Sequence, residues 1–156
     1  EVLKENHIPT HYVDANLMEG TMTVQPAKLF GKGLEVICRY RAVGSFLRRY
    51  GLYAEAGQPL DGFVEFTLKE DALVMLGILT AAEYKTLKDL TVKVSHLVKA
   101  VLRTKGIELY DIKLEFGRIG ADQSIAVIDE ISGGNMRAYQ GDKYLEPLVL
   151  EKLILE

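Results

Sequence analysis

Residues 109–117, which read Leu-Tyr-Asp-Ile-Lys-Leu-Glu-Phe-Gly, decide how the rest of the chain is interpreted. Apolar and charged side chains alternate along this segment, as in a β-strand, where successive side chains point to opposite faces of the sheet. The alternation predicts that Asp111, Lys113 and Glu115 share one face. The other face is predicted to carry the apolar and aromatic side chains, which are Tyr110, Ile112, Leu114 and Phe116.

A second strand is predicted at 124–128, after a turn that contains Gly117 and Gly120. Because the two strands are adjacent in sequence, the default arrangement is a hairpin. The second strand ends in Asp129 and Glu130, so three or four carboxylates and one lysine converge near one hairpin.

Such a group of charges suits phosphoryl transfer. Mg²⁺ takes one or two protein carboxylates together with phosphate oxygens, and a neighbouring lysine can neutralise the negative charge that develops during the reaction. The alternative interpretation is a solvent-facing strand with alternating charges. The apolar flanking strands, and the position of Asp129 and Glu130 at a strand end, favour a site.

Strands and helices are mixed along the rest of the chain, so the predicted fold class is α+β, with α/β as the alternative. The clearest helix runs from Ala81 to about Lys105, because apolar residues recur every three or four positions after a capping box formed by Thr80 and Glu83. The other predicted elements are strands at 11–14, 21–25, 34–40, 63–69 and 107–116, a short helix at 46–50, a final helix at 145–155, a connector at 26–33, and loops at 52–62 and 132–135.

A second candidate group stands around the short helix. Arg39 and Arg41 precede Gly44 and Ser45, and Ser45 is the predicted N-cap. A guanidinium can hold a phosphate with two hydrogen bonds, and a helix start offers free N–H groups to an anion. The alternative is an ordinary capped helix. A third group, Lys-Glu-Asp at 69–71, is by itself only a cluster of charged side chains at the end of a strand.

Composition narrows the class of protein. The 156 residues carry a net charge of −3, which argues against a general nucleic-acid binder. No apolar run reaches the roughly 20 residues that a membrane-spanning helix needs. The histidines show no zinc-ligand spacing. The single cysteine, Cys38, is predicted to be a small core residue, and one cysteine suits a reducing cytoplasm.

Three segments, in this order, resemble motifs of the SAICAR synthetase (phosphoribosylaminoimidazole-succinocarboxamide synthase) family. They are 36–45, in which Arg39 is followed six residues later by Ser45; 111–117, with its Asp-x-Lys-x-Glu pattern; and 129–132 (Asp-Glu-Ile-Ser), with Arg137 a few residues on. The last two together are specific, and the resemblance covers essentially the whole chain.

The resemblance implies a two-lobed fold that is distantly similar to protein kinases. Residues 1–33 would be the remnant of an N-terminal ATP-binding lobe and its hinge, and 34–156 the C-terminal lobe that binds substrate and metal. The implied reaction joins L-aspartate to carboxyaminoimidazole ribonucleotide (CAIR) with ATP and Mg²⁺, through a carboxyl phosphate, to give SAICAR, ADP and phosphate in purine biosynthesis. The implied partners are the small-molecule substrates ATP, CAIR and L-aspartate, with neither nucleic acid nor a membrane; a homo-oligomer is left open.

The resemblance also implies roles for individual residues. Three match the positions that hold the CAIR phosphate, namely Arg39, Ser45 and Arg137. Glu115 and Asp129 match the ligands of the metal that binds with ATP, and Lys69 matches a further residue of the ATP site. Asp111 and Lys113 match the catalytic polar residues beside the CAIR ring and carboxylate, and 24–31 matches the hinge that passes the adenine.

The sequence departs from the family pattern in two places. The β-rich start of the first lobe, with its Gly-Lys segment, has no counterpart, and a Gly-Asp-Pro type loop is missing after Leu73. Two other functions remain open, the first because of these departures and the second by analogy with the fold of protein kinases. One is a truncated, non-catalytic nucleotide-binding fragment of the same family, which would bind without turnover. The other is a small-molecule kinase that would need no aspartate.

Overall fold

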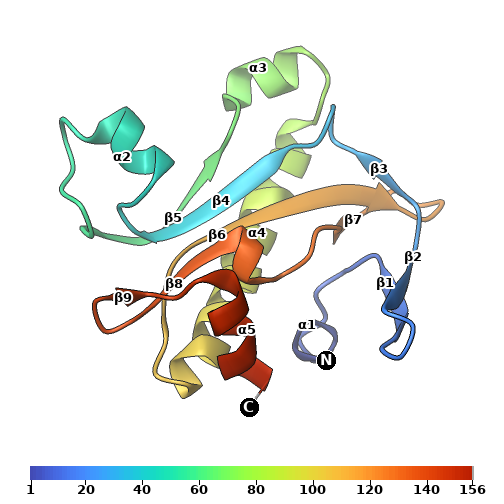
Figure 1. Ribbon diagram of the computed structural model, residues 1–156. Helices are drawn as coiled ribbons and strands as arrows, with labels where there is room; N and C mark the ends of the chain where they lie inside the picture. Colours follow the sequence, from blue (N-terminus) through green and yellow to red (C-terminus); the bar gives the residue numbers. More distant parts are fainter. Residues whose placement is uncertain (156) are drawn as a thin grey trace.

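The computed structural model describes residues 1–155, and in it a mostly antiparallel sheet carries a long helix on one face and a shorter one near the other (Figure 1). The predicted α+β class is confirmed. The elements are α1 (Val2–Glu5), β1 (Tyr12–Asn16), β2 (Thr21–Val24), β3 (Ala27–Leu29), β4 (Glu35–Arg41), α2 (Ser45–Tyr50), β5 (Pro59–Phe66), α3 (Glu70–Met75), α4 (Ala81–Thr104), β6 (Glu108–Ile119), β7 (Ser124–Val127), the 3₁₀ helix η1 (Gly133–Asn135), β8 (Met136–Gln140), β9 (Lys143–Tyr144) and α5 (Pro147–Leu155).

Strand β6 is the centre of the sheet, whose main path runs β5-β4-β6-β8-β9. Its first half pairs with β4 on one side and β8 on the other, and its second half pairs with β3 and β7. The predicted hairpin of β6 and β7 is therefore confirmed. Because β6 lies in the middle of the sheet, the side chains that alternate along it lie at the centre of each face.

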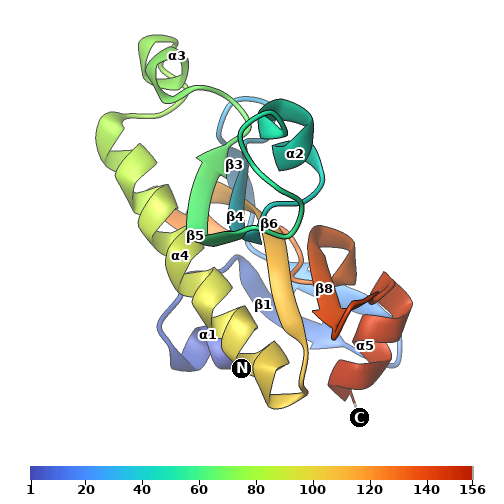
Figure 2. The same ribbon diagram turned by 90° about the vertical axis from the view of Figure 1, so that its left-hand side faces the viewer.

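Helix α4 covers one face of this sheet, as Figure 2 shows. Its N-terminus has the predicted capping box, in which Thr80 Oγ1 accepts from the Glu83 N–H at 3.1 Å and Glu83 Oε2 accepts from the Thr80 N–H at 2.8 Å. Its buried residues Leu87, Val94 and Leu102 belong to one core with apolar sheet residues, among them Val36, Cys38, Ile112 and Leu114. Cys38 is a core residue, as predicted. With α4 over the apolar face, the opposite face is left to polar side chains.

Residues 132–135, predicted as a loop, contain the single turn η1, which packs against α5. A Cβ atom on Gly133 would lie 2.7 Å from Cα of Pro147, so only glycine allows this approach. The final helix begins at Pro147 instead of residue 145, because Pro is well suited to a first helical position.

Several strands differ from the prediction. β5 covers 59–66 instead of 63–69, so part of the predicted loop at 52–62 pairs with β4. β3 lies inside the predicted connector at 26–33, and α3, β8 and β9 were not predicted. The extra strands are short and gain their hydrogen bonds from distant partners, so their local sequence pattern is weak.

Tyr110 was predicted on the apolar face, and this is wrong. The pairing of β6 with β8 shifts register between Leu109 and Asp111, so Leu109 is buried in the core while Tyr110 is only partly buried. The ring of Tyr110 stacks instead on Tyr139, at 3.9 Å between centroids. A bulge adds one residue to a strand and breaks the strict alternation on which the prediction relied.

The N-terminal residues form a separate two-stranded sheet, β1 with β2, but they are not detached from the rest. Phe30 is 1% exposed and Ile8 is buried, and both belong to the core that 34–156 also forms. β3 pairs with β6 as well. A division of the chain at residue 33 therefore stays a prediction. None of the helices described within residues 1–155 has the length and apolar character that crossing a membrane requires.

Candidate functional site

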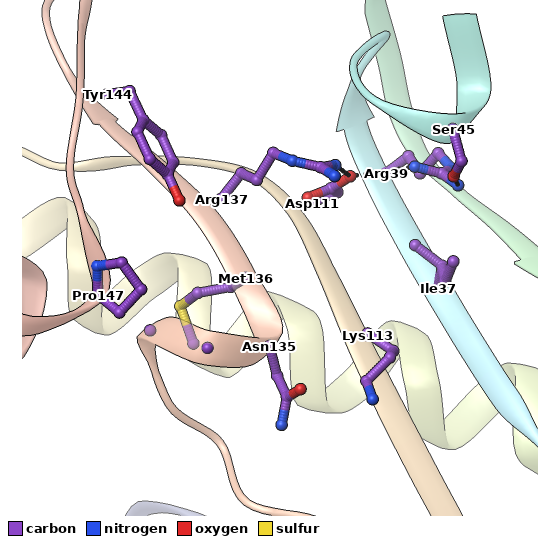
Figure 3. A pocket seen from close by; sticks show the side chains of 12 residues that line it. Ile37, Arg39, Ser45, Asp111, Lys113, Asn135, Met136, Arg137, Tyr144 and Pro147 are labelled. Atoms are coloured by element: carbon purple, nitrogen blue, oxygen red, sulfur yellow. Dashed lines mark hydrogen bonds and ion pairs between the residues drawn. The ribbon is translucent and has the colours of Figure 1, made fainter. Parts of the chain in front are cut away.

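A pocket of about 400 Å³ opens on the face of the sheet opposite α4, and Figure 3 shows its lining. Side chains of β4, β6 and β8 form its floor, and η1 and the start of α5 form one wall. The lining residues are Ile37, Arg39, Ser45, Asp111, Lys113, Gly133, Gly134, Asn135, Met136, Arg137, Tyr144 and Pro147. Five of the eight predicted site residues are thus brought together, namely Arg39, Ser45, Asp111, Lys113 and Arg137.

Arg39 lies in the floor of the pocket and is only 1% exposed. Its Nε donates to Glu65 Oε2 at 2.7 Å, and its Nη1 donates to Asp111 Oδ2 at 3.0 Å. Glu65 also pairs with Arg49. Two carboxylates therefore already balance this guanidinium, and a buried arginine requires such partners. The prediction did not include Glu65, although a single acidic residue between Val64 and Phe66 in an apolar strand was a signal for it.

Ser45 was predicted to cap the short helix, and this is wrong. The helix begins at Ser45, its N-cap is Gly44, and no side-chain hydrogen bond caps it. The Ser45 hydroxyl accepts instead from Nη2 of Arg39 at 2.8 Å. The hydroxyl is thus the partner of the third guanidinium nitrogen of Arg39, and Ser45 still lines the pocket.

Asp111 joins the two arginines of the pocket. Its Oδ2 accepts from Nη1 of Arg137 at 2.6 Å and from Arg39 on the other side (Figure 3). Burial raises the pKa of Asp111 above its ordinary value of 3.8, and the charges of Arg137 and Arg39 oppose that rise. Arg137 is more accessible than Arg39, with 39% of its side chain exposed. Arg137 is therefore the better placed of the two to meet an anion.

The approach of Arg137 depends on a glycine. Gly44 has φ +55°, and a Cβ atom there would lie 2.5 Å from Nη2 of Arg137. The glycine therefore supplies both a backbone conformation that L-residues rarely adopt and the space that the guanidinium occupies.

Lys113 lies two residues further along β6, with carboxylates around its ammonium. Nζ of Lys113 is 3.2 Å from Glu115 Oε1, 3.3 Å from Glu35 Oε1 and 3.6 Å from Asp129 Oδ2. Partial burial lowers the pKa of Lys113, but the hydrogen bonds to Glu115 and Glu35 outweigh it, so the pKa is raised above 10.5. Lys113 is thus a fixed positive charge at neutral pH. Glu35, which faces Glu115 across the β4–β6 pairing, was missed because only the register brings it there.

Glu115 and Asp129, the predicted metal ligands, fit a cation by charge, because three carboxylates around one ammonium leave an excess of negative charge. Asp129 is held in place, since its Oδ2 accepts from Nδ2 of Asn135 at 3.1 Å. Within residues 1–155, no three His, Cys, Asp or Glu side chains lie close enough together to hold a metal by themselves. A Mg²⁺ ion at Glu115 and Asp129 would therefore take its remaining ligands from phosphate and water, as Mg²⁺ usually does.

Lys69, the predicted ATP residue, is not among the residues that line this pocket. It is exposed and is the N-cap residue of α3, at the end of β5. Glu115 and Asp129 do not line this pocket either, but they join it through their contacts with Lys113, whereas no contact links Lys69 to the other predicted site residues among those described.

Comparison with known proteins gives a consistent result. A family model described as SAICAR synthetase matches residues 1–152. The phosphoribosylaminoimidazole-succinocarboxamide synthase of Clostridium tetani is 67% identical over 166 residues, which covers 100% of this chain and 73% of the relative. The same-named protein of Aquifex aeolicus is 35% identical over 151 residues and covers 89% of this chain and 67% of the relative. The alignment with the first relative is longer than this chain, so that relative has residues within the aligned region that this chain lacks.

Solved structures agree with the sequences. A SAICAR synthetase from a structural-genomics programme superposes with a TM-score of 0.83 at 33% identity, covering 91% of this chain and 66% of that chain. A SAICAR synthetase of type 2 in complex with ADP gives a TM-score of 0.84 at 26% identity, covering 98% of this chain and 71% of that chain.

Proposed function

The chain belongs to the SAICAR synthetase family, and on that premise we propose that it carries the substrate site of an ATP-dependent ligase. The ligase joins L-aspartate to CAIR and forms SAICAR, ADP and phosphate in purine biosynthesis. The substrates are small molecules, and we place the reaction in the cytoplasm.

One observation carries the proposal most strongly. Asp111, Lys113 and Glu115 occupy every second position of β6 and therefore point to one face. A group of side chains that can bind an anion and a group that can bind a cation thus lie side by side on this face. Arg137, held by Asp111, faces the pocket at one end. At the other end Lys113 stands among Glu35, Glu115 and Asp129. A substrate with a phosphate at one end and a carboxylate at the other fits this arrangement, because the phosphate meets Arg137 and the carboxylate meets Lys113 beside the Mg²⁺ that Glu115 and Asp129 would hold.

The roles follow from these positions. Arg137 holds the CAIR phosphate, with Ser45 and Arg39 behind it, so that the CAIR carboxylate lies beside Lys113. A carboxylate is a poor electrophile and must be activated. One of its oxygens attacks the γ-phosphorus of ATP, the bond from that phosphorus to ADP breaks, and an acyl phosphate forms. The amine nitrogen of L-aspartate then attacks the acyl carbon, phosphate leaves with the electron pair of the C–O bond, and the nitrogen releases a proton.

Lys113 contributes charge in this scheme. Because its pKa is raised, it remains protonated at neutral pH and stabilises the negative charge on the transferred group, whereas it cannot act as a general base. Glu115 and Asp129 would hold Mg²⁺, which when bound neutralises the phosphate oxygens of ATP. We assign Lys69 and the segment 24–31 to the ATP side of the site.

The test is a product assay. The purified protein is incubated with ATP, Mg²⁺, CAIR and L-aspartate, and ADP and SAICAR are quantified. The expected result is that ADP forms only when CAIR and L-aspartate are both present, in equal amount to SAICAR. ADP formation without L-aspartate would support a small-molecule kinase instead. Binding of CAIR and ATP without turnover would support the non-catalytic fragment.

A further inference from the structure

Tyr144 lines the pocket, yet none of the roles above uses it. It ends β9 and faces Tyr139 in the pairing of β8 with β9. Directly paired residues of neighbouring strands share a face, and Tyr139 shares its face with Arg137 two residues earlier. The ring of Tyr144 therefore stands on the same face as Arg137, and Figure 3 shows both side chains among those that line the pocket.

The ring is held by other aromatic side chains. Tyr144 lies 5.5 Å from Tyr139 between ring centroids, and Tyr139 stacks on Tyr110 at 3.9 Å. The guanidinium of Arg41 lies 5.8 Å from the Tyr110 ring centroid and closes the row. A side chain fixed in this way loses little conformational freedom when a ligand binds, which favours affinity.

The hydroxyl group of Tyr144 is available to a ligand. Within residues 1–155 no side-chain hydrogen bond involves the Tyr144 hydroxyl, and the residue, which lines the pocket, is 36% exposed. Arg137 uses one guanidinium N–H toward Asp111 and has others available. A phenol O–H and a guanidinium therefore both offer donors within the same pocket. Hydrogen-bond donors that are not yet paired within the protein match an anion with several oxygens, such as a phosphate monoester.

We propose that Tyr144 is a substrate-binding residue whose hydroxyl donates to the ribonucleotide phosphate beside Arg137. This inference rests on the proposed function, because it takes the pocket to be the ribonucleotide site. It adds a residue from β9 to a site whose floor is otherwise built on β4, β6 and β8.

The test uses two stable probes, 5-aminoimidazole-4-carboxamide ribonucleotide and the corresponding nucleoside without phosphate. Their binding to the wild-type chain and to Tyr144→Phe is measured by titration calorimetry. Phe keeps the ring and its packing, so the fold is not at risk. Tyr144→Phe is expected to bind the ribonucleotide about tenfold more weakly, the usual effect of one hydrogen bond to a charged group, and the nucleoside unchanged. Tyr53→Phe is the control, because Tyr53 is 86% exposed and outside the pocket lining.

The outcomes distinguish the role of Tyr144 from the proposed function of the pocket. If wild-type protein binds the ribonucleotide and Tyr144→Phe binds it equally well, the role of Tyr144 is refuted and the proposed function stands. If Tyr144→Phe weakens ribonucleotide and nucleoside alike, the contact is not with the phosphate and the inference is wrong. If the wild-type chain binds neither probe, the assignment of the pocket fails, and the role of Tyr144 fails with it.

Discussion

Arg39 and Asp111 stand directly opposite each other in the antiparallel pairing of β4 with β6, and Nη1 of Arg39 donates to Oδ2 of Asp111 at 3.0 Å. The same oxygen accepts from Arg137 of β8 at 2.6 Å. One carboxylate thus connects three adjacent strands across the floor of the pocket. Because Arg39 is buried and also bonded to Glu65, the relationship fixes the position of the more exposed Arg137.

Removing this carboxylate should destabilise the protein. Asp111→Ala leaves Arg39 with one carboxylate and Arg137 with none, and we expect a loss of about 3 kcal/mol in the free energy of unfolding, as when a buried ion pair is broken. Asp111→Asn should cost less, because burial raises the pKa of Asp111, and a neutral amide avoids that penalty while its oxygen still accepts a hydrogen bond.

Urea unfolding at neutral pH measures both variants. Asp89→Asn is the matched control, since Asp89 pairs with Lys85 on the exposed surface of α4 at 2.9 Å, and its loss should have no measurable effect. An Asp111→Ala variant as stable as wild type would show that the network does not hold the floor of the pocket.

Arg137→Ala should weaken the ribonucleotide far more than ATP. Loss of a charge-assisted hydrogen bond to a phosphate is expected to raise the apparent KM for CAIR by about 10- to 100-fold. Steady-state kinetics with each substrate varied in turn gives both values. Arg103→Ala, which removes an exposed arginine of α4 outside the pocket lining, should leave both unchanged. An equal effect of Arg137→Ala on CAIR and ATP would count against its placement.

Gly44→Ala should disturb the pocket through Arg137. The new Cβ would lie 2.5 Å from the Arg137 guanidinium, and φ of +55° with ψ of −125° is unfavourable for alanine by about 1–3 kcal/mol. Gly57→Ala is a matched control, because Gly57 has φ +77° and nothing within 4 Å of a Cβ. Both variants should lose some stability to urea, but only Gly44→Ala should lose affinity for the ribonucleotide. Equal affinities in the two variants would show that Arg137 does not need this space.

Asp129→Asn should abolish turnover with Mg²⁺ and ATP while the fold stays intact. The amide can keep the hydrogen bond from Asn135 but is a poor ligand for a hard cation, so we expect a fall in kcat of about 100-fold or more. Circular dichroism checks the fold, and Asp122→Asn, in the β6–β7 turn, is the charge-matched control. If Asp129→Asn retains the wild-type rate, the metal assignment is wrong.

Glu83 should give the protein an acid-sensitive contribution to stability. The hydrogen bond from Arg118, at 2.6 Å, is the main cause that lowers the pKa of Glu83 below its ordinary value of 4.5. A lowered carboxyl pKa means that the ionised form stabilises the fold. The contribution is therefore complete above pH 4.5 and is lost as the pH falls through the lower folded pKa.

Glu83→Gln isolates this effect, because glutamine can still close the capping box. We expect it to lose about 1 kcal/mol of unfolding free energy at neutral pH, and the difference from wild type should shrink in acid. Glu19→Gln, an exposed site on the β1–β2 turn, should show no difference at either pH. A Glu83→Gln difference that does not change with pH would contradict the assigned pKa direction.

Local periodicity was enough to predict part of the fold and the site. The alternation along β6 put Asp111, Lys113 and Glu115 on one face, and the spacing after Thr80 gave α4 and its capping box. Both depend on residues only two to four positions apart, where backbone geometry fixes which side chains meet. The same alternation was wrong for Tyr110, since a bulge depends on the partner strand.

The amino-acid sequence by itself determined the fold class, the charged face of β6 and the family. Only the tertiary structure decided which carboxylate meets which cation: Glu65 and Asp111 with Arg39, across 26 and 72 residues, and Glu35 with Lys113, across 78. It also decided that Arg39 is a buried support while Arg137 faces the pocket, and that Tyr144 lines the same pocket. The physical reason is strand register, because a shift of one residue turns every side chain to the opposite face, and register is set by the packing of the whole sheet.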